Sequence, residues 1–277
     1  NVSVLKIKLF ENNKNYIETI YSLLNSGQLE KLGVKYILIE SVQRRSLERF
    51  AINDMNINIS NIDNFKNQIL NNQKNDNLIQ SHSNEQFEIN WIDVFNSIFS
   101  KSNNNDVSVI NNLNLNAFIY NAKFKIKGHG KMAPHVYREL LNKDFFSTEV
   151  SRDLLFYDED LKYLKYESEE NIKLLNNNFN LLAKALGEKN IKLIFMPAVD
   201  KYNLYSPYII SNTYQKSIFF EYLDSLPKDY IFINTKKILS EQLEKGEKDI
   251  FYADDTHWSH KASEVIIKDE SFKIIFN

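Results

Sequence analysis

The sequence contains no cysteine, little glycine and proline, and no long apolar run. Of its 277 residues, 6 are glycine and 4 are proline. The absence of cysteine excludes disulfides, a cysteine nucleophile and thiolate metal ligands. The apolar runs reach only about six to eight residues, whereas a membrane-spanning helix needs ~20. The formal net charge of −2 leaves no basic excess for binding nucleic acid or anionic lipid.

What the chain does contain supports an ordinary globular core. With 43% hydrophobic residues over this length, we expect a single domain over residues 1–277. Asn, Gln, Asp and Ser dominate much of 53–116, which we expect to be a polar insert or cap. That insert could be a solvated elaboration without function or one wall of a carbohydrate groove. Because the chain opens with Asn1 rather than methionine, we expect that an upstream export signal or anchor has been removed.

Apolar runs and helical periodicities alternate along the chain. Strands are predicted at 2–10, 34–39, 117–126, 191–196 (stopped by Pro197), 230–234 and 250–252. Helices are predicted around 17–24, 167–186, 216–226, 235–245 and 261–267. Strands separated by helices predict right-handed crossovers and a mostly parallel sheet, in a three-layer α/β/α sandwich. In such sheets the functional groups collect outside the carboxyl ends of the strands.

The run 251–258, Phe-Tyr-Ala-Asp-Asp-Thr-His-Trp, is the most informative part of the sequence. It places a carboxylate two residues before a histidine, just after an apolar stretch. A carboxylate that orients an imidazole forms two parts of a hydrolase or acyltransferase triad. We expect His257 to accept the proton of the nucleophile and Asp255 to hold the imidazole, with Asp254 as the alternative carboxylate. Since cysteine is absent, the nucleophile has to be a serine or threonine.

Asp255-Thr256-His257-Trp258, followed by Ser259-His260-Lys261-Ala262, resembles the DTHW signature of the SGNH-hydrolase-like acetyltransferases. These extracytoplasmic proteins O-acetylate alginate and related cell-surface polysaccharides. The segments 194–201 (IFMPAVDK) and 155–161 (LFYDEDL) resemble further parts of that group. The resemblance implies an SGNH or flavodoxin-like sandwich, an extracytoplasmic location, a polysaccharide substrate and a membrane-bound O-acyltransferase that supplies the acetyl group. No cofactor, metal or nucleic acid is expected.

Ser41 is the predicted nucleophile. It follows the strand predicted at 34–39, where a tight strand-to-helix turn would project its oxygen from the sheet edge. Ordinary SGNH enzymes carry Gly-Asp-Ser at this place, whereas this chain has Ile39-Glu40-Ser41. A serine early and Asp-x-His late is the order of the ordinary SGNH enzymes, while the alginate acetyltransferases place their serine after the histidine. The serines after the histidine here lack a strand-to-turn setting: Ser259, Ser263 and Ser271.

Five further residues are predicted to bind substrate or stabilise an oxyanion: Arg44, Gly128, Lys201, Tyr202 and Trp258. Glycine lets a backbone N–H approach a ligand closely, so Gly128 could supply an oxyanion donor. Arg44 could bind a substrate carboxylate or pair with Glu40, and Trp258 could stack on a sugar or pack its own loop. The function we expect is O-acetyl transfer through an acyl-serine intermediate. An esterase that uses water as acceptor, and an inactive carbohydrate-binding module of the same fold, are the alternatives.

Overall fold

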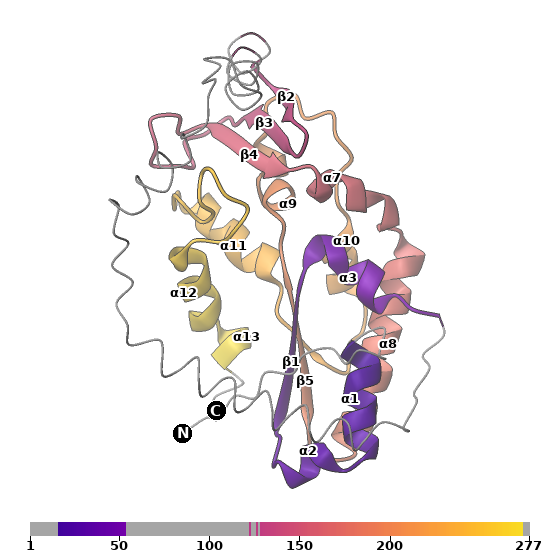
Figure 1. Ribbon diagram of the computed structural model, residues 1–277. Coiled ribbons are helices and arrows are strands. Elements are labelled where there is room, and N and C mark those ends of the chain that lie inside the picture. Colours follow the sequence, from indigo (N-terminus) through magenta and orange to yellow (C-terminus); the bar gives the residue numbers. More distant parts are fainter. Residues whose placement is uncertain (1–15, 54–121, 123–125, 127, 274–277) are drawn as a thin grey trace, which may run out of the picture.

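The protein has a mixed α/β fold with two separate sheets. The computed structural model describes residues 16–53, 122, 126 and 128–273 (Figure 1). Sheet A has the strand order β1 (Tyr36–Val42), β5 (Lys192–Ala198) and β6 (Ile231–Phe232), and both of its pairings are parallel. Sheet B is antiparallel, with the order β2 (Gly130–Ala133), β3 (Val136–Leu140) and β4 (Asp153–Tyr157).

Helices pack against sheet A from different directions. The described helices are α1 (Tyr16–Asn25), α2 (Gln28–Lys31), α3 (Gln43–Phe50), α7 (Glu159–Lys162), η1 (Tyr163–Tyr166), α8 (Glu169–Gly187), α9 (Lys201–Tyr205), η2 (Ser206–Tyr208), α10 (Phe219–Ser225), α11 (Thr235–Glu244), α12 (His260–Lys268) and α13 (Glu270–Lys273). The helices α3 and α8 contact β5, and so does α11. In Figure 1, α11 and α12 lie to the left of β1 and β5, whereas α1 and α8 lie to the right.

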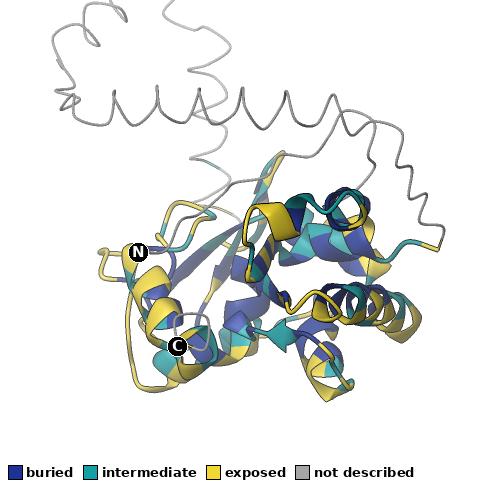
Figure 2. Cartoon of the chain, turned by 90° about the horizontal axis from the view of Figure 1, so that it is seen from below, coloured by how far each residue is buried: buried dark blue, intermediate teal, exposed yellow. Residues whose placement is uncertain are grey.

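The long helix α8 forms because its sequence meets both local and tertiary requirements. Ser168 caps its amino end by accepting a hydrogen bond from the Asn171 backbone N–H at 3.1 Å. Acidic residues in the first turn suit the positive end of the helix dipole. Its apolar side chains recur every three or four residues and are all buried: Ile172, Leu175, Phe179, Leu182 and Leu186. The opposite faces of the helices are exposed, as Figure 2 illustrates.

Three phenylalanine rings hold α3 and α8 on sheet A. The rings of Phe179 and Phe195 are stacked with centroids 4.4 Å apart, and Phe50 lies 5.2 Å from Phe179. All three side chains are fully buried. Burial alternates along β1, so Ile39 and Ser41 face this core while Glu40 is exposed. This alternation decides where the Ser41 hydroxyl points.

The strands predicted at 34–39, 191–196 and 230–234 are confirmed as β1, β5 and β6. The expectation that Pro197 ends its strand is wrong, because β5 continues to Ala198 and Ser41 pairs with Pro197. Proline has no N–H to donate to a ladder. The Pro197 carbonyl accepts a hydrogen bond from Thr235 Oγ1 at 2.5 Å, on the β6 side of the strand and beyond the end of β6. The N–H and carbonyl of one strand residue point to the same side, so the position without an N–H also faces away from β1. The pairing with β1 therefore loses no hydrogen bond.

Other predicted elements differ from the structure. The final strand, expected at 250–252, is reduced to an isolated antiparallel bridge between Phe251 and Trp258. A strand was expected at 117–126, but Ala122 and Ile126 are helical; the rest of that range lies outside the described residues. The strand expected at 2–10 also lies outside the described residues, as does the expected insert at 53–116 apart from residue 53. Sheet B was not predicted.

Candidate functional site

The DTHW run forms a closed loop at the carboxyl edge of sheet A. The Phe251–Trp258 bridge closes its base, where the Tyr252 N–H donates to the His257 carbonyl at 3.3 Å. Trp258 Nε1 donates to the carbonyl of Val199, the residue that follows β5, at 3.3 Å. Ser259 then caps α12, since its hydroxyl accepts from the Lys261 backbone N–H. The loop is thereby anchored beside the end of β5.

Asp255 and His257 are in direct contact in this loop. His257 Nδ1 lies 2.7 Å from Asp255 Oδ1, and the same oxygen accepts from the backbone N–H groups of Thr256 at 2.5 Å and His257 at 3.2 Å. The hydrogen bond from His257 is the main reason that the pKa of Asp255 lies below its ordinary value. Because a carboxylate only accepts, Nδ1 carries a proton and Nε2 of the neutral ring has a free lone pair. The His257 side chain is 81% exposed, so that lone pair is accessible.

Lys201 lies beneath the loop at the first position of α9. The residue is 1% exposed. Nζ donates to the carbonyls of Tyr252 at 2.7 Å, Ala253 at 2.9 Å and Asp255 at 2.9 Å. The residue predicted to bind substrate therefore contacts the backbone of the DTHW loop.

A buried group of charges joins the ends of β1 and β5. Arg44 Nη1 lies 2.6 Å from Asp200 Oδ1 and 3.3 Å from Asp160 Oδ1. The Arg44 backbone N–H also donates to Asp200 Oδ2 at 2.8 Å. The expected ion pair between Arg44 and Glu40 is not formed. Glu159 is a third acidic neighbour of Arg44, with its carboxylate 3.7 Å from Arg44 Nε. Arg44 is thus committed to an ion-pair group within the fold.

Burial sets the titration of this group. It raises the pKa of Asp160 to about 6, although the Arg44 charge acts in the opposite direction. It also raises the pKa of Asp200 well above the ordinary value, and the nearby Asp160 charge adds to that effect. Burial would lower the pKa of Arg44, but Asp200 and Asp160 outweigh it and the net shift is upward. The guanidinium thus stays charged and is shared between two carboxyl groups.

Ser41 lies at the carboxyl end of β1, but its hydroxyl faces the core. The residue is 2% exposed. Its Oγ accepts a hydrogen bond from Arg49 Nη1 at 3.1 Å and donates to the Val42 carbonyl at 3.3 Å. Within the part of the chain that the structure describes, no hydrogen bond joins Ser41 to His257. The geometry therefore assembles Asp255 with His257 and does not bring the Ser41 oxygen to them.

The remaining predicted residues occupy three different settings. Gly128 is exposed, with a φ of +70° that favours glycine, and its carbonyl accepts from Arg138 at 2.8 Å at the entrance to sheet B. Tyr202 is fully buried, and its hydroxyl donates to the Gln215 carbonyl at 3.0 Å. Trp258 is half-buried and holds its loop through Val199. Of these three residues, only Trp258 belongs to the DTHW loop.

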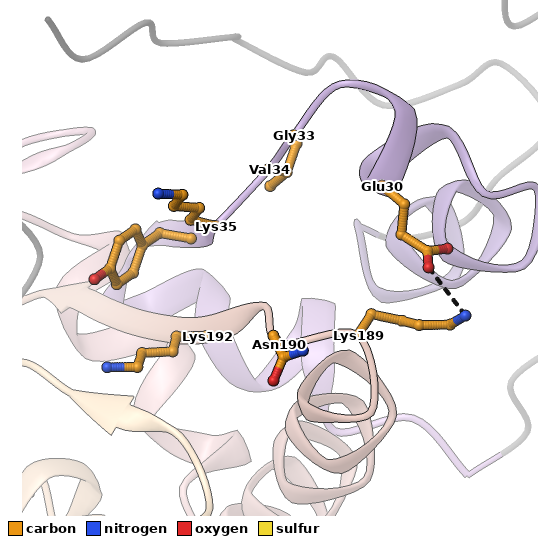
Figure 3. Close-up of a pocket in the computed structure, with 8 residues that line it drawn as sticks. Glu30, Gly33, Val34, Lys35, Lys189, Asn190 and Lys192 are labelled. Atoms are coloured by element: carbon orange, nitrogen blue, oxygen red, sulfur yellow. Dashed lines mark ion pairs between the residues drawn. The ribbon is translucent and has the colours of Figure 1, made fainter.

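A hollow of about 430 Å³ lies elsewhere, at the amino ends of β1 and β5. Figure 3 shows its lining, in which Lys189 pairs with Glu30 at 3.0 Å and the side chains of Lys35 and Lys192 line the same hollow. This is the opposite edge of the parallel sheet from the DTHW loop. Since the functional groups of such sheets gather at the carboxyl edge, we do not assign this hollow to the candidate site.

Comparisons with known proteins add no relative. No protein-family model, no curated protein and no solved structure matches the chain. Among residues 16–53 and 128–273, no group of three or more histidine, aspartate and glutamate side chains is placed to hold a metal ion. In the same part of the chain, no helix has the length and apolar character needed to cross a membrane. The functional argument therefore rests on the residues of the site and on the DTHW resemblance.

Sequence reasoning missed Asp160 and Asp200 as parts of the site. Both acids lie in segments that carry the family resemblance, but neither was assigned a role there. Their partner Arg44 lies 116 and 156 residues away in the sequence. Asp200 had one local signal: like Arg44, it follows a strand of the same parallel sheet.

Proposed function

We propose that the protein is an O-acetyltransferase or acetylesterase of the SGNH kind that acts on polysaccharide hydroxyls. The observation that carries the proposal is the 2.7 Å contact between Asp255 Oδ1 and His257 Nδ1, with the ring exposed at the carboxyl edge of sheet A. A carboxylate that fixes an imidazole in this way makes a general base for an oxygen nucleophile. The DTHW resemblance alone favours transfer over hydrolysis.

The proposal extends to the fold and the setting. A three-layer α/β/α sandwich of the SGNH or flavodoxin kind is supported by α8 and α11, which both pack on β5. From the resemblance we infer a location outside the cytoplasm, a polysaccharide as substrate and a membrane-bound O-acyltransferase as the source of acetyl groups. No cofactor is part of the proposed reaction.

In the first form of the mechanism, Ser41 is the covalent nucleophile. His257 Nε2 takes the hydroxyl proton while Oγ bonds to the acetyl carbonyl carbon and the carbonyl electron pair moves onto oxygen. The pair returns as the donor oxygen leaves with that proton, and an acceptor hydroxyl or water then releases the acetyl group from Ser41 by the same steps. This form requires the Ser41 hydroxyl to leave Arg49 and reach the loop.

The burial of Ser41 favours a second form, in which no acyl-serine is made. The Ser41 residue is 2% exposed and bonded to Arg49, whereas the His257 side chain is 81% exposed. An incoming sugar hydroxyl or water can approach Nε2 without any rearrangement. His257 would then remove its proton directly as it attacks the acetyl donor.

One experiment tests the proposal and separates the two forms. The wild-type protein is incubated with an aryl acetate, with and without an oligosaccharide, and acetyl-sugar and free acetate are quantified by mass spectrometry. We expect His257→Gln to lower turnover by at least about 10²-fold, the usual contribution of a general base. Full activity in His257→Gln would refute the proposed function. An acetylated Ser41 peptide, lost in Ser41→Ala, would establish the first form; unchanged turnover in Ser41→Ala would establish the second.

A further inference from the structure

The contacts of Lys201 with the DTHW loop require a particular chemical state of its side chain. A lysine ammonium has three N–H donors and no acceptor, and Nζ has three carbonyl partners within 2.9 Å. A neutral amine has only two N–H groups, and its lone pair would face the third carbonyl. Only the charged form can therefore satisfy the three carbonyls together, through charge-assisted hydrogen bonds.

The tip of the loop depends on this contact. The base is closed by the Phe251–Trp258 bridge and by the bond from Trp258 to Val199. Between these two positions, no other described residue outside the loop hydrogen-bonds its backbone. The Asp255 carboxylate and the His257 ring are both more than half exposed, so packing does not hold them.

We propose that Lys201 is a positioning residue: its ammonium group fixes the loop backbone so that Asp255 and His257 meet, and losing that group separates them. The catalytic consequence rests on the function proposed above, whereas the effect on the loop does not. Lys201 touches no substrate in this role, because it is buried beneath the loop.

The charges around Lys201 make the contact sensitive to pH. Asp160 of α7 and the loop residues Asp254 and Asp255 act on its charge, and its Nζ lies 5.2 Å from the centre of the Phe146 ring. Burial lowers the pKa of Lys201 to about 7, while the three carboxylates favour the charged form. The side chain consequently loses its proton near neutral pH, and the loop should loosen as it does.

The test replaces Lys201 by methionine, which keeps an unbranched side chain and removes every donor. Lys228→Met is the matched control, because Lys228 Nζ also holds two backbone carbonyls, at 3.1 Å from Asp224 and 2.6 Å from Leu226, away from the loop. At pH 6, amide hydrogen exchange and aryl acetate turnover are measured for both variants and the wild type. Thermal unfolding confirms that each variant is folded.

We expect Lys201→Met to speed exchange of the Thr256 and His257 amides on the order of 10-fold, because the loop opens locally. Turnover should fall by about 10²-fold in kcat with a smaller change in KM, as expected when catalytic groups are misplaced by about 1 Å. Lys228→Met should change neither quantity. Wild-type exchange at these two amides in Lys201→Met would overturn the proposal, whatever the activity.

The unaltered protein provides a second measurement if Lys201→Met does not fold. Wild-type exchange at Thr256 and His257, corrected for the intrinsic effect of pH, should be faster at pH 8.5 than at pH 6. The corrected exchange rate of the Asp229 amide, next to Lys228, should not change between these two pH values. The 13Cε NMR shift of Lys201 shows at which pH its amine becomes neutral, and an unchanged corrected exchange rate above that pH would contradict the role of the ammonium group. If the wild type shows the expected exchange rates but no turnover of the aryl acetate, only the proposed function is refuted and the positioning role of Lys201 stands.

Discussion

Arg44 and Asp200 are joined at two points, one through a side chain and one through the backbone. Arg44 Nη1 lies 2.6 Å from Asp200 Oδ1, and the Arg44 N–H donates to Oδ2 at 2.8 Å. Arg44 is in the first turn of α3 after β1, and Asp200 lies just after β5. One carboxylate therefore fixes the start of α3 against the end of the neighbouring strand. Asp200 directly precedes Lys201, the first residue of α9. The ion pair therefore also fixes the start of the helix from which Lys201 contacts the DTHW loop.

We predict that Arg44→Met lowers the free energy of unfolding by about 3 kcal/mol, because it leaves two buried carboxyl groups without their cation. Urea unfolding at pH 7 measures the change. Arg45→Met is the matched control: Arg45 pairs with Glu48 on the surface, and such pairs contribute at most about 1 kcal/mol. Adding Asp200→Asn to Arg44→Met should restore part of the loss. Equal effects of the two single variants would contradict the structural role of Arg44.

The choice between the two adjacent acids of the DTHW run can be tested by activity. Asp255→Asn should reduce turnover of an aryl acetate by about 10⁴-fold, because an amide cannot hold the imidazole as the carboxylate does. Asp254→Asn should retain activity within a factor of about 10, since Asp254 makes no hydrogen bond to the ring. Both acids are exposed, so unfolding should be unaffected in either variant. A larger loss in Asp254→Asn would identify the other carboxylate as the partner of His257.

The parallel strands could be predicted because dense apolar runs are typical of strands buried within α/β folds. The strands β2 and β3 of sheet B lack that signal. Strand β3 reads Val-Tyr-Arg-Glu-Leu, and all but one of its residues are half-buried or exposed. Charged and apolar residues mix there because tertiary packing rather than periodicity defines the strand. A local pattern could not find it.

In the candidate site, too, contacts between residues close in sequence could be predicted, whereas contacts between distant residues could not. The Asp255–His257 contact spans two residues, so the sequence predicted both partners. The contact of Lys201 with the loop spans more than fifty residues, and only the fold reveals it. The setting expected for Ser41 is wrong in one respect: β1 runs on to Val42, so Ser41 lies within the strand and alternation turns it inward. A strand boundary error of a few residues was enough to change the predicted exposure of the hydroxyl.

Ser41→Ala separates a structural hydroxyl from a catalytic one. The substitution removes the acceptor of the Arg49 hydrogen bond, for which we expect a loss of about 1 kcal/mol in the free energy of unfolding. Ser46→Ala is the control, since its buried hydroxyl also bonds a backbone carbonyl, that of Val42 at 3.1 Å. If Ser41 is the nucleophile, turnover of an aryl acetate should fall by at least about 10³-fold in Ser41→Ala alone. Comparable turnover in the two variants would leave Ser41 with only its structural bond.

The pH dependence of stability gives an independent measure of the Lys201 charge. Its pKa is lowered to about 7 in the folded protein, below the ordinary value of about 10.4 in the unfolded chain. Between these values the unfolded chain binds more protons, so this group makes the free energy of unfolding rise with pH. The slope should approach about 1.4 kcal/mol per pH unit between pH 7.5 and pH 9.

Lys201→Met removes that contribution, so urea unfolding of the wild type and the variant should be compared from pH 5 to pH 9. The wild-type free energy of unfolding minus that of the variant should increase above pH 7. Below about pH 6 the difference should be constant, because Lys201 is then protonated in both states and the slope vanishes. A constant difference across the whole range would mean that Lys201 keeps an ordinary pKa. The three carbonyls would then stabilise the ammonium enough to offset its burial, and the loop would stay clamped at alkaline pH as well.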